Sequence, residues 1–91
     1  MKYQIKKRFT NEVMFKGEAE SFVKFVEQHK ANLSKADLSE TDLSEANLSN
    51  SDLSNSNLSN SDLSNSDLYK AKIKITQKED LLKALKIEIL E

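Results

Sequence analysis

The chain has 91 residues, a formal net charge of −1 and no cysteine, so it is long enough for one small domain and excludes thiol and disulfide chemistry. It contains no apolar run long enough to span a membrane, and its first residues do not resemble a signal peptide, so we expect a cytoplasmic protein without a membrane partner. The charge is uneven: residues 1–30 carry +3, residues 31–69 carry −6 and residues 70–91 carry +2, which places an acidic belt between two mildly basic ends.

Residues 1–30 are expected to form an N-terminal cap that begins with a hairpin. Tyr3, Ile5 and Phe9 alternate with polar residues, which predicts a strand over residues 2–9. Residues 10–12 fit a three-residue loop, and residues 13–16 return as a second strand, which Gly17 is expected to end.

A helix is expected to complete this cap. Ser21 is a suitable N-cap residue, and the apolar positions after it recur at helical spacing on one face. That face consists of Phe22, Phe25, Val26 and His29. We expect the helix to run directly into residue 31 and to cover the open end of the segment that follows.

A five-residue pattern recurs from residue 31 to residue 75, with a small residue first, mostly Asp or Asn second, and Leu or Ile third. A helix spreads residues five apart around its surface and a strand sends them to alternate faces, so neither gathers the leucines on one side. A disordered linker would have no reason for such regular spacing. A chain that turns a corner every five residues directs its first and third residues inward, which predicts a solenoid. The predicted inward core is Leu33, Leu38, Leu43, Leu48, Leu53, Leu58, Leu63, Leu68 and Ile73, and the predicted small inward residues are Ala31, Ala36, Thr41, Ala46, Ser51, Ser56, Ser61, Ser66 and Ala71.

This Ala-(Asp/Asn)-Leu-Ser-X pattern resembles the pentapeptide-repeat family, and the flanks resemble those of its short bacterial and phage-borne members. The resemblance implies an all-β solenoid: a right-handed quadrilateral β-helix of about two coils, with small α/β caps at both ends. Four repeats would form one coil, so residues twenty apart would stack. Asp42 and Asp62 would then be the one stacked pair of acids among the second positions.

The fifth positions predict how the corners turn. A type II turn requires a positive φ at its third residue, which Asn tolerates better than Lys or Glu. We therefore predict type II turns at Asn50, Asn55, Asn60 and Asn65, and another turn type at Lys35, Glu40, Glu45 and Lys70. The inward serine hydroxyls are expected to bond to nearby backbone groups or water.

Residues 76–91 are expected to form a C-terminal cap. Thr76 and Glu79 have the spacing of a capping box, which predicts a short helix, and residues 87–89 alternate like a strand. The candidate cap or dimer surface consists of Leu81, Leu82, Leu85, Ile87, Ile89 and Leu90. Either these residues only cap the solenoid, or they also form a homodimer through this end or by strand addition; of the two we expect the homodimer.

No arrangement of residues in the sequence indicates an enzyme. His29 lies on an apolar face, the serines are repeat positions without an arranged base, and the repeat lacks the glycines of calcium-binding β-rolls. Asp42 and Asp62 approach the spacing of a retaining glycosidase, but on an open convex surface. We therefore predict no catalytic residue, no metal, no cofactor and no small-molecule substrate.

The predicted function is a non-catalytic structural or protein-interaction module with an unidentified protein partner. An alternative follows from the resemblance, because some family members bind DNA gyrase, a type II topoisomerase, as mimics of DNA. The acidic belt favours this alternative and the short repeat segment counts against it. The acidic belt also argues against nucleic-acid binding by the coil.

Overall fold

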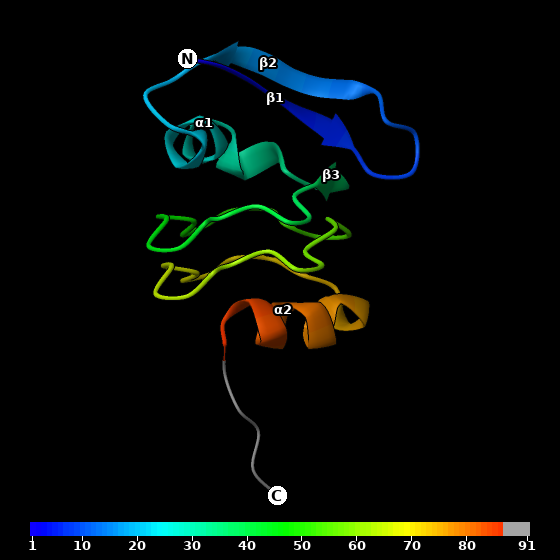
Figure 1. The fold of residues 1–91 in the computed structure, drawn as a ribbon. Coiled ribbons are helices and arrows are strands. Elements are labelled where there is room, and N and C mark those ends of the chain that lie inside the picture. The colour runs from blue at the N-terminus through cyan, green and yellow to red at the C-terminus, as the bar shows by residue number, and fades with distance from the viewer. Residues whose placement is uncertain (87–91) are drawn as a thin grey trace, which may run out of the picture.

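The computed structural model describes residues 1–86 of the chain (Figure 1). Two helices lie at opposite ends of a stack of coils, and the N-terminal hairpin lies beyond the first helix (Figure 1). The elements in chain order are β1 (Lys2–Lys7), β2 (Val13–Glu18), α1 (Phe22–Gln28), the 3-10 turn η1 (Lys30–Asn32), β3 (Ala36–Asp37), the 3-10 turn η2 (Ile75–Gln77) and α2 (Lys78–Ala84).

The predicted hairpin is present and forms part of a three-stranded sheet. β1 pairs antiparallel with β2 on one edge and with β3 on the other, in the order β2-β1-β3. Two details of the prediction were wrong. β1 ends at Lys7, so Phe9 lies in the loop and is 91% exposed. Gly17 does not end β2 but pairs with Tyr3 inside it.

The first helix begins where the sequence predicts. The Ser21 hydroxyl accepts a hydrogen bond from the Lys24 backbone N–H at 3.2 Å, which satisfies one of the free donors of the first turn. Phe25 and Val26 are fully buried on the inner face. α1 ends at Gln28 rather than continuing to residue 31, and η1 connects it to the first coil.

The repeats form coils in which residues twenty apart lie side by side, as predicted. Parallel bridges join four second positions to the ones twenty residues later: Asp37 with Asn57, Asp42 with Asp62, Asn47 with Asp67, and Asp52 with Lys72. Backbone hydrogen bonds follow the same register; the Leu38 N–H, for example, donates to the Asn57 carbonyl at 3.0 Å. Backbone donors and acceptors of one coil thus find partners on the next.

All eight fifth positions from residue 35 to residue 70 turn in the same way, which corrects the prediction of mixed turn types. Their φ values lie between 57° and 66°, and the residues before them have no positive φ, which is the combination of a type II turn. Lys35, Glu40, Glu45 and Lys70 share the conformation of the four asparagines. Stacking requires every corner to superimpose on the corner of the next coil, so tertiary pairing overrides the local preference of Lys and Glu.

The interior is a column of leucines. Leu33, Leu38, Leu43, Leu48, Leu53, Leu58 and Leu63 are at most 1% exposed, and burial of each contributes about 2 kcal/mol. Among the small inward positions, Ala36, Ala46, Ser51, Ser56 and Ser61 are buried, while Thr41, Ser66 and Ala71 are partly buried, as is Leu68.

Two residues assigned to the interior lie outside it. Ile73 is 36% exposed, because the second coil ends at the Asp52–Lys72 bridge and no third coil among residues 1–86 covers the residues that follow. Ala31 is exposed because it belongs to η1, which precedes the first corner.

The C-terminal helix is present, but it does not start at a capping box formed by Thr76 and Glu79. Thr76 lies in η2 and is exposed, and α2 begins at Lys78. α2 ends at Ala84, and Lys86, the second residue after it, has a left-handed φ of 58° in the place where glycine is common. The predicted strand over residues 87–89 lies outside the described residues, and the division of the chain at residues 30 and 75 stays a prediction.

Candidate interaction surface

The outer columns of the coil hold a repeated side-chain pair. In the six consecutive repeats from Asp37 to Asp62, the second-position Asp or Asn accepts hydrogen bonds from the backbone N–H and the hydroxyl of the fourth-position Ser. At Asp42 these bonds measure 3.0 Å from the Ser44 N–H and 2.6 Å from the Ser44 hydroxyl. Asn47 forms the same pair with Ser49. The outer polar residues therefore stabilise the corners in addition to facing solvent.

These bonds change the acidity of three carboxyl groups. The hydroxyl of the following serine, and then its backbone N–H, lower the pKa of Asp42, Asp52 and Asp62 below its ordinary value. The Asp62 carboxylate also lies 3.3 Å from the Lys86 ammonium group. The stacked acids Asp42 and Asp62 are thus ionised groups held by turn contacts on an open surface.

Most inward serines donate a hydrogen bond to a leucine carbonyl, and Ser51 is the exception. The hydroxyls of Ser56, Ser61 and Ser66 donate to the carbonyl of the leucine three residues earlier, at 2.7–2.8 Å, which confirms the prediction for these residues. The Ser51 hydroxyl is buried and has no hydrogen-bond partner among residues 1–86.

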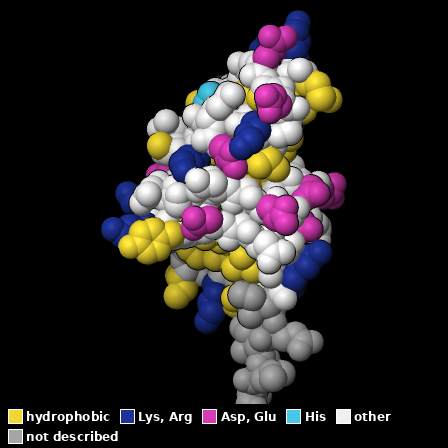
Figure 2. Space-filling model, turned by 90° about the vertical axis from the view of Figure 1, so that its left-hand side faces the viewer, with side chains coloured by type: hydrophobic (Ala, Val, Ile, Leu, Met, Phe, Trp, Pro, Cys, Tyr) yellow, Lys and Arg dark blue, Asp and Glu magenta, His cyan; other side chains and the backbone are white. Residues whose placement is uncertain are grey.

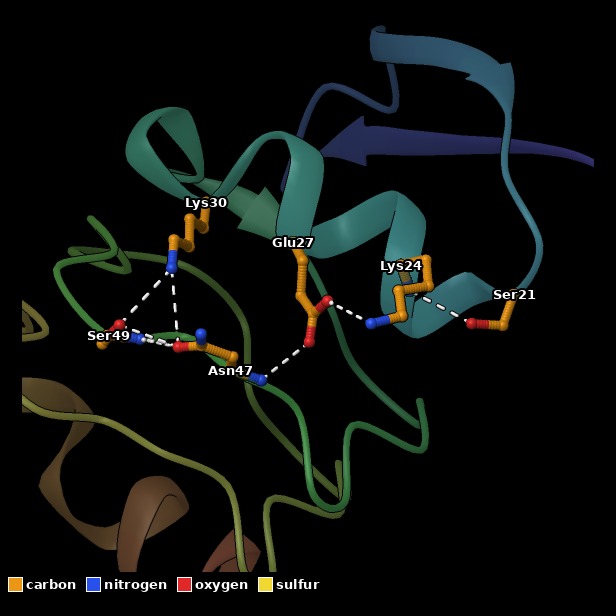
Figure 3. A network of polar contacts seen from close by, with 6 residues as sticks. All are labelled: Ser21, Lys24, Glu27, Lys30, Asn47 and Ser49. Carbon is orange, nitrogen blue, oxygen red and sulfur yellow. Dashed lines mark hydrogen bonds and ion pairs between the residues drawn. The ribbon is translucent and has the colours of Figure 1, made fainter.

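Side chains of the N-terminal cap take the place of a preceding coil (Figure 3). The Glu27 carboxylate accepts the Asn47 backbone N–H at 2.8 Å, whereas the Asp67 N–H of the next coil donates to the Ala46 carbonyl at 2.9 Å. The Lys24 ammonium group holds the other Glu27 oxygen at 3.4 Å. A carboxylate from α1 thus occupies the position of a backbone carbonyl.

Lys30 completes this junction. Its ammonium group lies 3.5 Å from Asn47 Oδ1 and 3.4 Å from the Ser49 hydroxyl, so it contacts one of the outer Asn–Ser pairs. Its backbone carbonyl accepts the Asp52 N–H at 2.9 Å. The cap is therefore bound to the stack at Asn47 and Ser49 and again at Asp52.

Gln77 closes the opposite end of the stack. Its amide oxygen accepts the Asn55 N–H at 2.9 Å and the Lys74 N–H at 2.7 Å. Its amide nitrogen lies 2.7 Å from the Leu53 carbonyl and 3.0 Å from the Ser56 carbonyl. The side chain is 5% exposed, so it serves as a buried substitute for a third coil.

Sequence reasoning missed Gln77 and the Asp/Asn–Ser pairs. The Asp or Asn at the second position and the Ser at the fourth have the spacing of an Asx turn, so the sequence alone could have predicted these pairs. Gln77 occurs once and outside the repeat, so no pattern distinguishes it from an exposed glutamine.

His29 belongs to the aromatic packing of the N-terminal cap. Its ring stacks on Phe15 with centroids 4.1 Å apart and meets the edge of Phe25 at 5.0 Å. These contacts fix the ring between the sheet and α1, in agreement with its expected place on an apolar face.

The C-terminal end presents apolar side chains. Ile75 is 87% exposed and Tyr69 is 65% exposed, and Leu81, Leu82 and Leu85 are partly buried. Figure 2 shows apolar side chains along this edge of the coil and acidic side chains over the coil itself. The other candidate residues of this surface, Ile87, Ile89 and Leu90, lie outside the described residues.

Residues 1–86 contain no group of three or more His, Cys, Asp or Glu side chains placed to hold a metal ion. No helix within the same residues combines the length and the hydrophobicity needed to cross a bilayer.

Comparison with known families gives one match. Residues 30–73 match the model of the family described as pentapeptide repeats, in eight copies. Repeats of this kind imply a β-helix type of fold, which agrees with the pairing of residues twenty apart. Comparisons with curated proteins and with solved structures found no match.

Proposed function

Because this chain belongs to the pentapeptide-repeat family, we propose that it is a non-catalytic structural and protein-interaction module built on a right-handed quadrilateral β-helix of about two coils. One observation carries the proposal: the polar side chains of the repeat are already used by the fold. Second-position Asp and Asn bind fourth-position Ser, and three of the inward serines bind leucine carbonyls. Such side chains present a fixed surface to a partner rather than a reacting group.

Binding to a purified partner tests this proposal. Immobilised protein would be used to capture proteins from the native cytoplasm, and each captured protein would be purified and titrated against the free chain by calorimetry. The proposal predicts a 1:1 or 2:2 complex of micromolar or tighter affinity. Absence of any reconstituted complex would contradict it.

A second copy of the chain is the proposed partner at the C-terminal end. The support is the exposed Ile75 and Ile73 beside the partly buried leucines of α2. An Ile75→Lys variant should shift the mass measured by light scattering from that of a dimer to that of a 10.4 kDa monomer. A wild-type protein that scatters as a monomer at high concentration would refute the homodimer.

Mimicry of DNA toward a type II topoisomerase such as gyrase is the second candidate. It is favoured by the column in which Asp42 and Asp62 are paired and ionised, and by the exposed Asp67 of the column that contains Asn47. An Asp42→Asn/Asp67→Asn variant should then lose inhibition of supercoiling while it keeps its fold, because Asn forms the same turn in other repeats. A wild-type protein without effect on supercoiling at micromolar concentration would exclude this candidate.

A further inference from the structure

The loop of the N-terminal hairpin lies beside the coil and forms a groove with it. The groove has a volume of about 560 Å³, within the range of ligand sites. It is lined by Lys7, Arg8, Phe9, Thr10, Lys35, Asn55 and Thr76, which come from the hairpin, from two stacked corners and from η2. Three of these residues are cations and none is an acid.

The cations of the groove have no acidic partner among residues 1–86. Ion pairs within 4 Å in this part of the chain join Lys24 with Glu27 and Lys86 with Asp62. Arg8 is nevertheless fixed: its Nη1 donates to the Asn55 carbonyl at 3.0 Å and to the Ser56 carbonyl at 3.1 Å. These two bonds immobilise the guanidinium at the edge of the groove, where no acid within residues 1–86 balances its charge, so it can attract an anion that enters the groove.

Phe9 adds an apolar platform that folding does not explain. Its side chain is 91% exposed, and its φ of 71° lies in the left-handed region, where a bulky residue is strained. The Arg8 guanidinium carbon lies 4.4 Å from the centre of its ring. Exposure and strain in one residue beside unpaired cations indicate a binding role.

We propose that this groove binds an acidic segment of a partner protein, with carboxylates on Arg8, Lys7 and Lys35 and an aliphatic side chain on Phe9. The inference rests on the proposed function as an interaction module and names the surface and the chemistry of the partner. A protein segment fits better than nucleic acid, because the coil beside the groove carries an excess of acids that repels a polyanion. A short peptide places two or three carboxylates on the cations and needs no contact with the rest of the coil.

Two variants separate binding from folding. Phe9→Gly removes the ring and relieves the strained φ, so it should raise the melting temperature by about 5 °C while it weakens binding at least tenfold. Lys35→Asn keeps a residue that accepts its φ of 66° and removes one cation, so binding should weaken about fivefold. The matched controls are Asn11→Gly in the same loop and Lys70→Asn at another corner, with φ values of 64° and 59°. Both controls should bind like the wild type.

Fluorescence anisotropy with defined probes tests the proposal. The probe is a fluorescein-labelled peptide of three Leu-Glu repeats, compared with the same peptide in which Gln replaces Glu and with labelled oligothymidylate of eight nucleotides. We expect binding of the Leu-Glu peptide alone, weakening between 50 and 200 mM salt. Failure of the wild type to bind this peptide at millimolar concentration would overturn the proposal.

Two other results would also decide against it. Preferential binding of oligothymidylate that is lost in Phe9→Gly would assign the groove to single-stranded nucleic acid instead. A partner captured by the full chain whose affinity is unchanged by Phe9→Gly and Lys35→Asn would leave the proposed module function intact and remove this groove from it.

Discussion

Replacement of Ser51 by Ala should stabilise the protein, although it removes a polar group from a repeat that otherwise uses such groups. The Ser51 hydroxyl is 0% exposed and has no hydrogen-bond partner among the described residues. A buried hydroxyl without a partner costs about 1–3 kcal/mol, and Ala fits the same small inward position at Ala36 and Ala46. We therefore expect Ser51→Ala to raise the free energy of unfolding by about 1 kcal/mol.

The same change at Ser56 should have the opposite sign. The Ser56 hydroxyl donates to the Leu53 carbonyl at 2.7 Å and receives the Gln77 amide at 3.2 Å. The amide keeps two carbonyl partners in the variant, so the loss should be about 1 kcal/mol. The two variants are chemically identical substitutions on neighbouring sides of one coil.

Urea denaturation followed by circular dichroism measures both free energies, and thermal melts provide a second estimate. For a chain of this length 1 kcal/mol corresponds to about 4–8 °C in melting temperature. The two variants should therefore melt roughly 10 °C apart or more. Equal destabilisation by both variants would refute the reasoning, because it would show that Ser51 is hydrogen-bonded in solution.

Three further predictions concern the ends, the corners and the acids. Gln77→Met, which keeps the side-chain volume, should cost about 2–4 kcal/mol in urea denaturation, because it leaves the part-buried backbone N–H groups of Asn55 and Lys74 without their partner. A loss below about 1 kcal/mol would show that Gln77 is not needed to close the stack. Glu45→Gly should raise the free energy of unfolding by about 1 kcal/mol and Asn50→Gly by less, because both residues have φ near 60° but Asn tolerates this conformation better than Glu. Melting curves in which Asn50→Gly gains more stability than Glu45→Gly would contradict the strain argument. Carboxyl groups with a lowered pKa stabilise the fold above their ordinary pKa and lose this contribution as the pH falls below about 4. A variant with Asn at Asp42, Asp52 and Asp62 should therefore show less loss of melting temperature between pH 7 and pH 2 than the wild type. An unchanged pH profile would refute the assignment.

The repeat allowed much of the fold to be predicted because its period specifies a geometry. A leucine at every fifth residue has one compact solution, and the pairing of residues twenty apart agrees with it. The corners at Lys35 and Glu40 were predicted wrongly because propensity is local, whereas the turn at each corner is dictated by the coil that stacks on it. Ile73 was misassigned for a related reason: the pattern continues in the sequence, but the stack that would bury it has ended.

The groove beside the hairpin loop was beyond prediction from the sequence. Phe9 was assigned to a strand by alternation, and only the structure shows that the strand ends at Lys7. Arg8 and Asn55 are brought together by the fold across 47 residues of sequence. The Asp/Asn–Ser pairs were easier to predict, because both members lie within one repeat.

Gln77 and Glu27 together set how long the stack is. A bare coil end offers a ring of backbone donors and acceptors onto which another coil, from the same chain or a different molecule, can add. Each of the two side chains consumes some of these groups with an amide or a carboxylate that cannot propagate the ladder. Gln77 and Glu27 thus prevent further coils from adding to either end of the stack. Their removal should therefore favour end-to-end fibres, a failure distinct from unfolding.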